Sequence, residues 1–140
     1  METNKPILQI KNLEKTYPNG VQALKGVSFD VKRGEFLVII GLSGSGKSTM
    51  LRCLNQLHPA TGGQILFNGK DVTSLAGEDL RWLRQKMAMI FQHFNLIERH
   101  SVIGNVLTGA LGRTGILASF LGAYSQGDKE SAQKLSLIHI

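Results

Sequence analysis

The first third of the chain carries two stretches in which apolar and polar residues alternate. Residues 7–13 alternate roughly, whereas residues 27–31 alternate cleanly and place three apolar side chains on one face, namely Val27, Phe29 and Val31. Alternation with a period of two is typical of a strand with one buried face. A turn signal, Pro18-Asn19-Gly20, separates the two stretches. The pattern therefore predicts a small antiparallel sheet with one buried face.

The next apolar stretch, residues 36–40, contains no polar residue and lies between Gly34 and Gly41. A continuous apolar run suits a strand that is covered on both faces, as in a parallel sheet. Residues 47–57 then fit a helix that stops before Pro59. A strand, a glycine-rich turn and a helix in this order predict the opening of a βαβ unit.

The middle of the chain predicts a hairpin and a second helix. After a break at Thr61-Gly62-Gly63, residues 64–67 fit a short strand and Asn68-Gly69 fits a tight turn. Residues 77–86 fit a helix because apolar residues recur along one face, at Leu80, Leu83 and Met87.

The last part of the chain gives fewer signals. Residues 87–91 form a second continuous apolar run, which predicts a second core strand. Ser101 is suited to the N-cap of a helix that continues through Val102, Val106 and Leu107. Beyond Gly112 the pattern weakens, and we predict no element there.

One stretch carries a specific chemical motif, which follows the first continuous apolar run. Its residues are Gly41, Leu42, Ser43, Gly44, Ser45, Gly46, Lys47, Ser48 and Thr49, and the first eight match G-x-x-x-x-G-K-[ST]. A strand before this motif and a helix after it form the context in which the loop wraps around a phosphate chain. A glycine-rich turn without a ligand is the alternative.

The residue types of this loop suit a triphosphate. Glycines allow the positive φ angles and the close approach that backbone N–H groups need to surround phosphate oxygens. The helix that begins near Lys47 points its unpaired N–H groups and its positive dipole end at the same place. The Lys47 ammonium is expected between the β- and γ-phosphates. The Ser48 hydroxyl is suited to Mg²⁺, which prefers oxygen ligands.

Because kinases, GTPases, motor ATPases and transporter ATPases share such a loop, two flanking residues matter. Tyr17 precedes the loop and is a candidate to stack on adenine, although spacing alone favours a half-buried tyrosine at a strand end. Gln92 directly follows the second apolar run. Ligands lie at the carboxyl ends of strands in α/β sheets, so Gln92 is a candidate to bind Mg²⁺ or to hold a water. A polar strand-end residue without a ligand is an equally good interpretation of Gln92.

Composition narrows the class of protein. The 140 residues are 42% apolar and 19% charged, which is enough for one packed domain and too little for two. A single cysteine, Cys53, excludes an internal disulfide framework and a multi-cysteine metal site, and fits a reducing compartment. The net charge of +6 is scattered, with no run longer than Lys32-Arg33, so we expect a solvated basic surface and no nucleic-acid partner.

No targeting or membrane segment is predicted. Residues 1–5 are polar, and the apolar residues that follow are too few for a secretory signal. The stretch from 102 to 124 leans apolar but contains Arg113 and five glycines, so we do not expect it to span a membrane.

Taken together, these residues resemble an ATP-binding-cassette (ABC) transporter ATPase. The resemblance is carried, in the family's order, by residues 24–29, Gly34-Glu35, residues 41–49, residues 62–65, Asn68-Gly69 and residues 90–92. Within the family, residues 91–96, Ser101-Val102 and residues 105–109 look like the phosphonate-import ATPases of bacteria. Importers of methionine and of polar amino acids are the close alternatives.

The resemblance implies a fold and a set of roles. The fold is an α/β P-loop NTPase with a RecA-like core, incomplete here, an N-terminal antiparallel β subdomain and the start of a helical subdomain. Tyr17 would stack on the adenine, the loop would hold ATP and Mg²⁺, and Gln92 would open a loop that senses the γ-phosphate and touches membrane subunits. Residues 110–123 would lie in the helical subdomain that docks on those subunits, through exposed apolar side chains such as Ile116, Leu117, Phe120 and Leu121. An ordinary amphipathic core helix is the alternative there.

Other family features have no counterpart in residues 1–140: a strand ending in Asp-Glu, a Leu-Ser-Gly-Gly-Gln signature and a later switch histidine. We therefore expect residues 1–134 to be the N-terminal part of an ATPase domain that binds nucleotide weakly and barely hydrolyses it alone. Residues 135–140 match the translation of a transposon-end adapter used in sequencing libraries, which predicts a non-native tail. A native amphipathic C-terminal strand is the alternative.

The sequence thus predicts the ATP-binding subunit of an importer of phosphonate or a related small solute. Its implied partners are membrane-spanning permease subunits, a second ATPase subunit and, indirectly, a periplasmic solute-binding protein. Its implied location is the cytoplasmic face of the bacterial inner membrane. A soluble ATPase of the same superfamily that acts on ribosomes or DNA, and a non-catalytic nucleotide-binding module, are the rival hypotheses.

Overall fold

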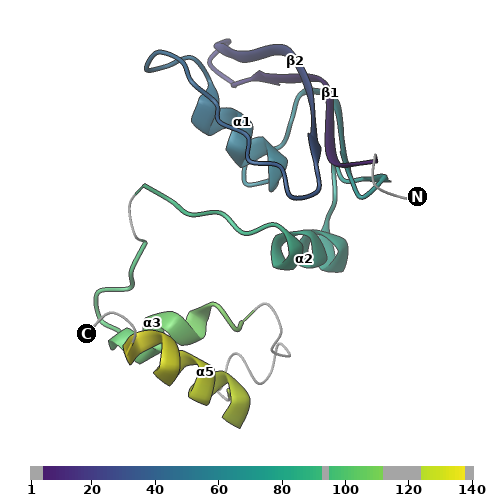
Figure 1. Ribbon diagram of the computed structural model, residues 1–140. Coiled ribbons are helices and arrows are strands. Elements are labelled where there is room, and N and C mark those ends of the chain that lie inside the picture. Colours follow the sequence, from purple (N-terminus) through teal and green to yellow (C-terminus); the bar gives the residue numbers. More distant parts are fainter. Residues whose placement is uncertain (1–4, 93–94, 112–123, 138–140) are drawn as a thin grey trace. The chain divides into compact units, whose positions relative to one another are not determined.

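The computed structural model describes residues 5–92, 95–111 and 124–137, and the chain divides into two compact units, residues 1–87 and 88–140. The first unit contains β1 (Pro6–Thr16), β2 (Gln22–Lys32), α1 (Lys47–Leu54), β3 (Gly62–Phe67), β4 (Lys70–Asp71) and α2 (Gly77–Lys86) (Figure 1). The second unit contains α3 (Val102–Thr108) and α5 (Gln126–Leu137).

The four strands form one antiparallel sheet in the order β2-β1-β3-β4. This confirms the predicted antiparallel pairing of the first two strands. Both strands are longer than the stretches in which apolar and polar residues alternate, residues 7–13 and 27–31. The alternation of β1 is rough because Asn12 adopts a positive φ of 48° and the pairing register shifts there. Ile10 and Leu13, which flank this irregularity, are therefore both buried although they are three residues apart.

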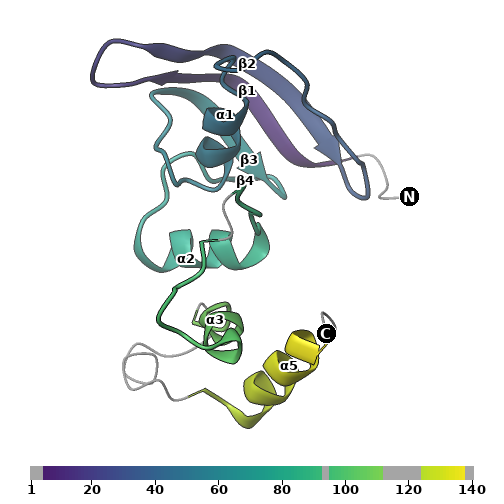
Figure 2. The ribbon, with the colours of Figure 1, turned by 90° about the vertical axis from the view of Figure 1, so that its left-hand side faces the viewer.

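Helix α1 lies against the sheet, as Figure 2 shows. Its apolar side chains join those of the strands in one core, whose buried members are Ile10, Leu13, Leu24, Met50, Cys53, Leu54, Ile65, Phe67, Val72 and Leu83. The helix begins at Lys47 as predicted but ends at Leu54, three residues before the predicted end. The backbone of Gln56 turns to a positive φ of 54°, which no helix can continue.

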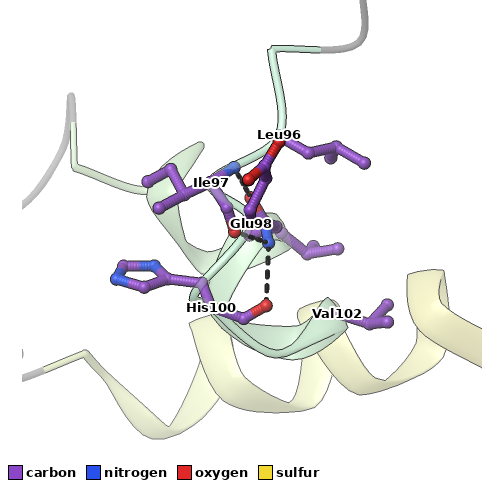
Figure 3. A pocket seen from close by; sticks show the side chains of 7 residues that line it. Leu96, Ile97, Glu98, His100 and Val102 are labelled. Carbon is purple, nitrogen blue, oxygen red and sulfur yellow. Dashed lines mark hydrogen bonds between the residues drawn. The ribbon is translucent and has the colours of Figure 1, made fainter.

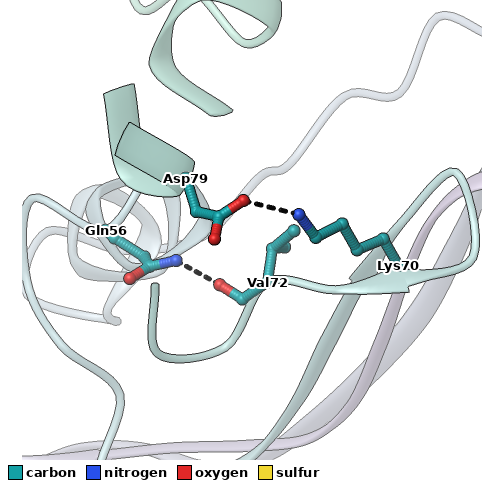
Figure 4. Close-up of polar contacts among 4 residues, drawn as sticks. All are labelled: Gln56, Lys70, Val72 and Asp79. Carbon is teal, nitrogen blue, oxygen red and sulfur yellow. Dashed lines mark hydrogen bonds and ion pairs between the residues drawn. The ribbon is translucent and has the colours of Figure 1, made fainter. Parts of the chain in front are cut away.

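Gln56 uses its side chain to bind the segment between β4 and α2. Its amide nitrogen donates to the Val72 carbonyl, and its Oε1 accepts from the Leu75 N–H at 2.9 Å (Figure 4). Nearby, the Lys70 ammonium lies 2.7 Å from the Asp79 carboxylate in the first turn of α2. The chain that follows α1 is thus tied to the segment after β4, and the start of α2 is tied to β4 itself.

The predicted hairpin and α2 are confirmed. Asn68 and Gly69 both have positive φ, at 50° and 79°, as a tight two-residue turn requires. Helix α2 has the predicted bounds, and its face is anchored by Leu83, which is fully buried.

The two predicted core strands are wrong for the described chain. Neither residues 36–40 nor residues 87–91 are assigned to a strand, and Phe36, Ile40 and Ile90 are 90%, 90% and 97% exposed. A strand needs a neighbouring strand for its ladder hydrogen bonds, and the sheet of the described residues contains only β1 to β4. The apolar composition of the two runs was therefore not sufficient to make them strands.

In the second unit, α3 packs on α5. Ser101 is the N-cap of α3, as predicted, and its Oγ accepts from the Gly104 N–H at 3.1 Å. Residues 135–137 continue α5, so this part of the predicted tail is helical rather than the alternative strand. The predicted docking segment, residues 110–123, lies outside the described residues except for Ala110 and Leu111. No helix of the described chain is long and apolar enough to cross a bilayer.

Candidate nucleotide-binding site

The phosphate loop leads into α1 through two glycines in the left-handed region, Gly44 at φ 79° and Gly46 at φ 93°. Residues other than glycine avoid this region because their Cβ atom collides with the backbone. At Gly46 there is also no space, since an added Cβ would lie 2.5 Å from the Ala23 carbonyl oxygen of β2. Gly46, which the motif requires, therefore has a steric reason in this fold, whereas Gly44 lies at a position where the motif allows any residue and has only a conformational reason.

The start of α1 is open to an anion. Its N-cap is Gly46, and within the described chain no side chain caps it and no acidic residue lies in the first turn. The first N–H groups of a helix have no partner inside the helix and carry its positive dipole end. The beginning of α1 thus offers several hydrogen-bond donors to a phosphate, as the sequence predicted.

Lys47 closes the loop on itself. Its ammonium donates to the carbonyl oxygens of Gly41 and Leu42 at 2.7 Å each and approaches the Ser45 hydroxyl at 3.4 Å. These oxygens are neutral acceptors, and a phosphate oxygen would form a stronger, charge-assisted bond with the same ammonium. The loop therefore holds a cation beside unpaired N–H groups, which fits a polyphosphate.

Tyr17 lies beside the phosphate loop although 30 residues separate it from Lys47 in sequence. Its hydroxyl is 3.2 Å from Thr49 Oγ1 in the first turns of α1 and 3.1 Å from Nδ1 of His58. Ser48, the predicted magnesium ligand, is exposed at the start of the same helix. The structure thus brings Tyr17, Lys47, Ser48 and Thr49 into one region.

Two residues of this region were missed by the sequence reasoning. His58 contacts Tyr17 edge-on, with ring centroids 5.8 Å apart and an angle of 84° between the rings. Lys15 is buried, its ammonium lies 5.4 Å from the centre of the Tyr17 ring, and it donates to the Pro59 carbonyl at 2.6 Å. A period of two from the buried Leu13 places Lys15 on the inner face of β1, and this signal was available in the sequence.

The single cysteine of the chain, Cys53, is not a reactive nucleophile. Cys53 on α1 is fully buried, and burial raises the pKa of its thiol, while the Lys15 ammonium opposes this to a smaller extent. A thiol with a raised pKa stays protonated and is a poor nucleophile. Cys53 therefore belongs to the core.

Gln92 is exposed and belongs to the second unit. Its predicted place near the phosphates stays a prediction.

Comparison with known proteins gives the family. The family model described as "ABC transporter" matches residues 24–139. "Phosphonates import ATP-binding protein PhnC" of Bdellovibrio bacteriovorus is 51% identical over the whole of this chain and 54% of its own length. The protein of the same name from Shouchella clausii is 47% identical over 96% of this chain and 51% of its own length. The chain thus spans about half the length of these curated relatives.

Solved structures agree with the family and the fold. A dimeric post-hydrolysis state of the ATP-binding cassette MJ0796, bound to ADP and Pi, has a TM-score of 0.76 at 33% identity, over 91% of this chain and 54% of its own. A nucleotide-free ATP-binding cassette from an ABC transporter has a TM-score of 0.74 at 28% identity, over 93% of this chain and 52% of its own. The predicted membership of the α/β P-loop ATPases is thereby confirmed, and the chain belongs to the ABC transporter family.

Proposed function

We propose that this chain is the nucleotide-binding part of the ATP-binding subunit of an ABC importer, in which ATP binding and hydrolysis drive the uptake of phosphonate or a related small solute. The observation that carries the proposal is the loop of residues 41–49, where the Lys47 ammonium lies beside the uncapped start of α1. The names of the relatives from Bdellovibrio bacteriovorus and Shouchella clausii support phosphonate as the solute.

In this proposal the loop would bind the phosphates of ATP. The Ser48 hydroxyl would supply an oxygen ligand to Mg²⁺, and Gln92 would supply an amide oxygen to the ion or to the attacking water. Lys47 and Gln92 are the residues of this chain that would touch the reacting phosphate. The bound ion would neutralise charge that develops on the phosphate oxygens during hydrolysis.

The partners we propose are membrane-spanning permease subunits, a second ATPase subunit and, indirectly, a periplasmic solute-binding protein, at the cytoplasmic face of the inner membrane. A hollow of about 520 Å³ in the second unit supports a permease contact. It is lined mostly by apolar side chains from the turn before α3 and from α3 itself: Leu96, Ile97, Glu98, His100, Val102, Asn105 and Val106 (Figure 3). Leu96 and Val102 are 66% and 69% exposed and line the same hollow, and exposed apolar side chains that lie together mark interaction surfaces.

The wall of this hollow is held by Asn105 of α3. Its side chain accepts from the Ile97 N–H at 2.7 Å and donates to the carbonyls of Ile97, His100 and Ser101. The amide nitrogen of Asn105 has two hydrogens, so the three carbonyls share them, and together with the bond from Ile97 N–H they tie the turn to α3. Figure 3 shows the residues that line the hollow around this turn. An apolar hollow of this kind suits the apolar face of an amphipathic helix of a partner protein.

Nucleotide binding is tested with the intact gene product that contains this chain. Isothermal titration with ATP should show affinity that depends on Mg²⁺, and Lys47→Ala should abolish most of it. A conservative control is Lys25→Gln, which removes an exposed lysine from β2. Binding that is insensitive to both Mg²⁺ and Lys47 would refute the nucleotide site.

Transport is tested in cells that depend on a phosphonate as their phosphorus source and carry a disrupted gene. Restoring the intact gene should restore growth, and Leu96→Asp should reduce both growth and co-purification of the permease. Glu78→Lys on α2 is a matched surface control outside the second unit. If growth on phosphonate never depends on the gene, the solute assignment fails while nucleotide binding still stands.

A further inference from the structure

The side chain of Tyr17 is held at three points. Its hydroxyl lies between Thr49 Oγ1 and His58 Nδ1, at 3.2 and 3.1 Å, and the two rings meet edge-to-face at an angle of 84°. A phenol hydroxyl can donate one hydrogen bond and accept another, so both contacts can be satisfied together. Edge-to-face aromatic pairs are themselves favourable. A ring held in this way does not rotate freely about its side-chain bonds.

The segment that carries His58 is itself fixed. His58 precedes Pro59, and a residue before proline is restricted to extended backbone conformations. The Pro59 carbonyl accepts from the buried Lys15, while the Thr61 N–H donates to the Glu14 carbonyl at 2.9 Å. This segment is thereby bound to the end of β1, directly before Tyr17. His58 and Tyr17 therefore keep a constant relation to each other.

The surroundings also limit which face of the ring a ligand can use. The Lys15 ammonium lies over the Tyr17 ring, 5.4 Å from its centre, so a planar ligand can stack only on the opposite face. Tyr17 is half-buried, so its side chain is partly accessible to solvent.

We propose that His58 is a positioning residue: through its Nδ1 and its ring contact it holds the Tyr17 ring as a preformed platform for the base of a bound nucleotide. The inference rests on the proposed nucleotide-binding function and extends it to a residue that contacts neither base nor phosphate. Because the Tyr17 side chain is already fixed before the nucleotide binds, binding does not have to immobilise it, and the affinity is higher by that entropy. The benefit applies to ligands that have a base and is absent for ligands that consist of phosphate alone.

Two substitutions of His58, together with one of Tyr17, separate the parts of the contact. His58→Phe keeps an aromatic ring against Tyr17 but removes the hydrogen-bonding nitrogen. His58→Asn removes the ring but keeps a polar atom at the position of Nδ1. Tyr17→Phe removes the hydroxyl that His58 binds. Lys25→Gln on the exposed side of β2 is the control.

The measurement is the dissociation constant of the intact gene product for ATP and for inorganic tripolyphosphate, both with Mg²⁺. His58→Phe should weaken ATP binding about 3- to 10-fold and leave tripolyphosphate within about twofold, because only the base uses the platform. His58→Asn should recover most of the ATP affinity. In a Tyr17→Phe background, His58→Phe should cause no further loss, because the hydrogen bond is already absent.

Parallel losses for ATP and tripolyphosphate would show that His58 only supports the fold and would overturn the proposal. Full additivity of His58→Phe and Tyr17→Phe would do the same. Failure of the underlying function gives a different result: Tyr17→Ala would then leave the ratio of ATP to tripolyphosphate affinity unchanged. In that case the proposal for His58 falls because Tyr17 is not a platform.

Discussion

Substituting three glycines that have similar φ angles distinguishes two reasons for glycine in the phosphate loop: the left-handed backbone and the lack of space for a side chain. Gly44 and Gly69 both have φ of 79°, and an added Cβ would meet nothing within 4 Å at either position. Gly46 has φ of 93°, and its Cβ would lie 2.5 Å from the Ala23 carbonyl oxygen and 3.1 Å from Leu24 Cδ2. Gly69 belongs to the β3–β4 turn and has no part in the loop.

The expected magnitudes follow from these surroundings. Alanine in the left-handed region costs about 1–2 kcal/mol, so Gly44→Ala and Gly69→Ala should each destabilise the protein by about that amount. Gly46→Ala adds a collision with the backbone of β2, which is held by its ladder with β1 and cannot retreat freely. Overpacking of this kind costs about 1–3 kcal/mol more. The expected total for Gly46→Ala is therefore about 2–5 kcal/mol.

The assay is equilibrium urea unfolding of the intact gene product, with Mg-ATP affinity measured on the same samples. Gly44→Ala and Gly69→Ala should have similar unfolding free energies, whereas only Gly44→Ala should weaken ATP binding, since only it displaces amides of the loop. Gly46→Ala should reduce both. If Gly46→Ala is no less stable than Gly69→Ala, the steric argument is wrong, and the loop does not require the close approach to β2.

Three further changes test other parts of the molecule. Lys47→Ala should weaken ATP binding about 10- to 100-fold in titration calorimetry, the usual value of a hydrogen bond to a charged group. Hydrogen bonds from the Thr73 side chain, and then from Gln64, hold the pKa of Asp71 below its ordinary value. The ionised Asp71 carboxylate therefore stabilises the folded state above its unfolded-state pKa, and this contribution is lost as the pH falls through its folded-state pKa. With Asp71→Asn, the urea midpoint of unfolding should fall less steeply below about pH 4 than it does in the unchanged protein. Phe36→Ser combined with Ile90→Ser should reduce self-association of the 140-residue chain in sedimentation velocity, because both side chains are at least 90% exposed; unchanged sedimentation would count against that reasoning.

Elements that depend on local chemistry were predictable from the sequence. The Asn68-Gly69 turn, the Ser101 cap and the bounds of α2 each follow from residues that lie within a few positions of one another. The rough alternation of residues 7–13 did not reveal where the irregularity lies, because the register shifts around Asn12 involve the pairing of β1 with two neighbours at once. A pattern along one strand does not contain the register of its partners.

The same division applies to the candidate site. Residues 41–49 were recognised from their own spacing, whereas the contact of His58 with Tyr17 joins residues 41 positions apart. Lys15 was marked only by its place on the inner face of β1, where a charged side chain is unusual. Residues that support a functional residue from a distant part of the chain leave little trace in spacing.

The contrast between the phosphate loop and the apolar runs beside it has a physical basis. Lys47 is bound to carbonyls five and six residues before it, and the Ser45 N–H donates to the Leu42 carbonyl. These bonds close within the loop itself, so the loop forms whether or not residues 36–40 are paired. A strand has no such internal bonds, and its order depends entirely on neighbours. An apolar run therefore predicts a buried strand only where a partner strand exists. The sequence of a phosphate loop predicts the structure of the loop because its hydrogen bonds join residues of the loop itself.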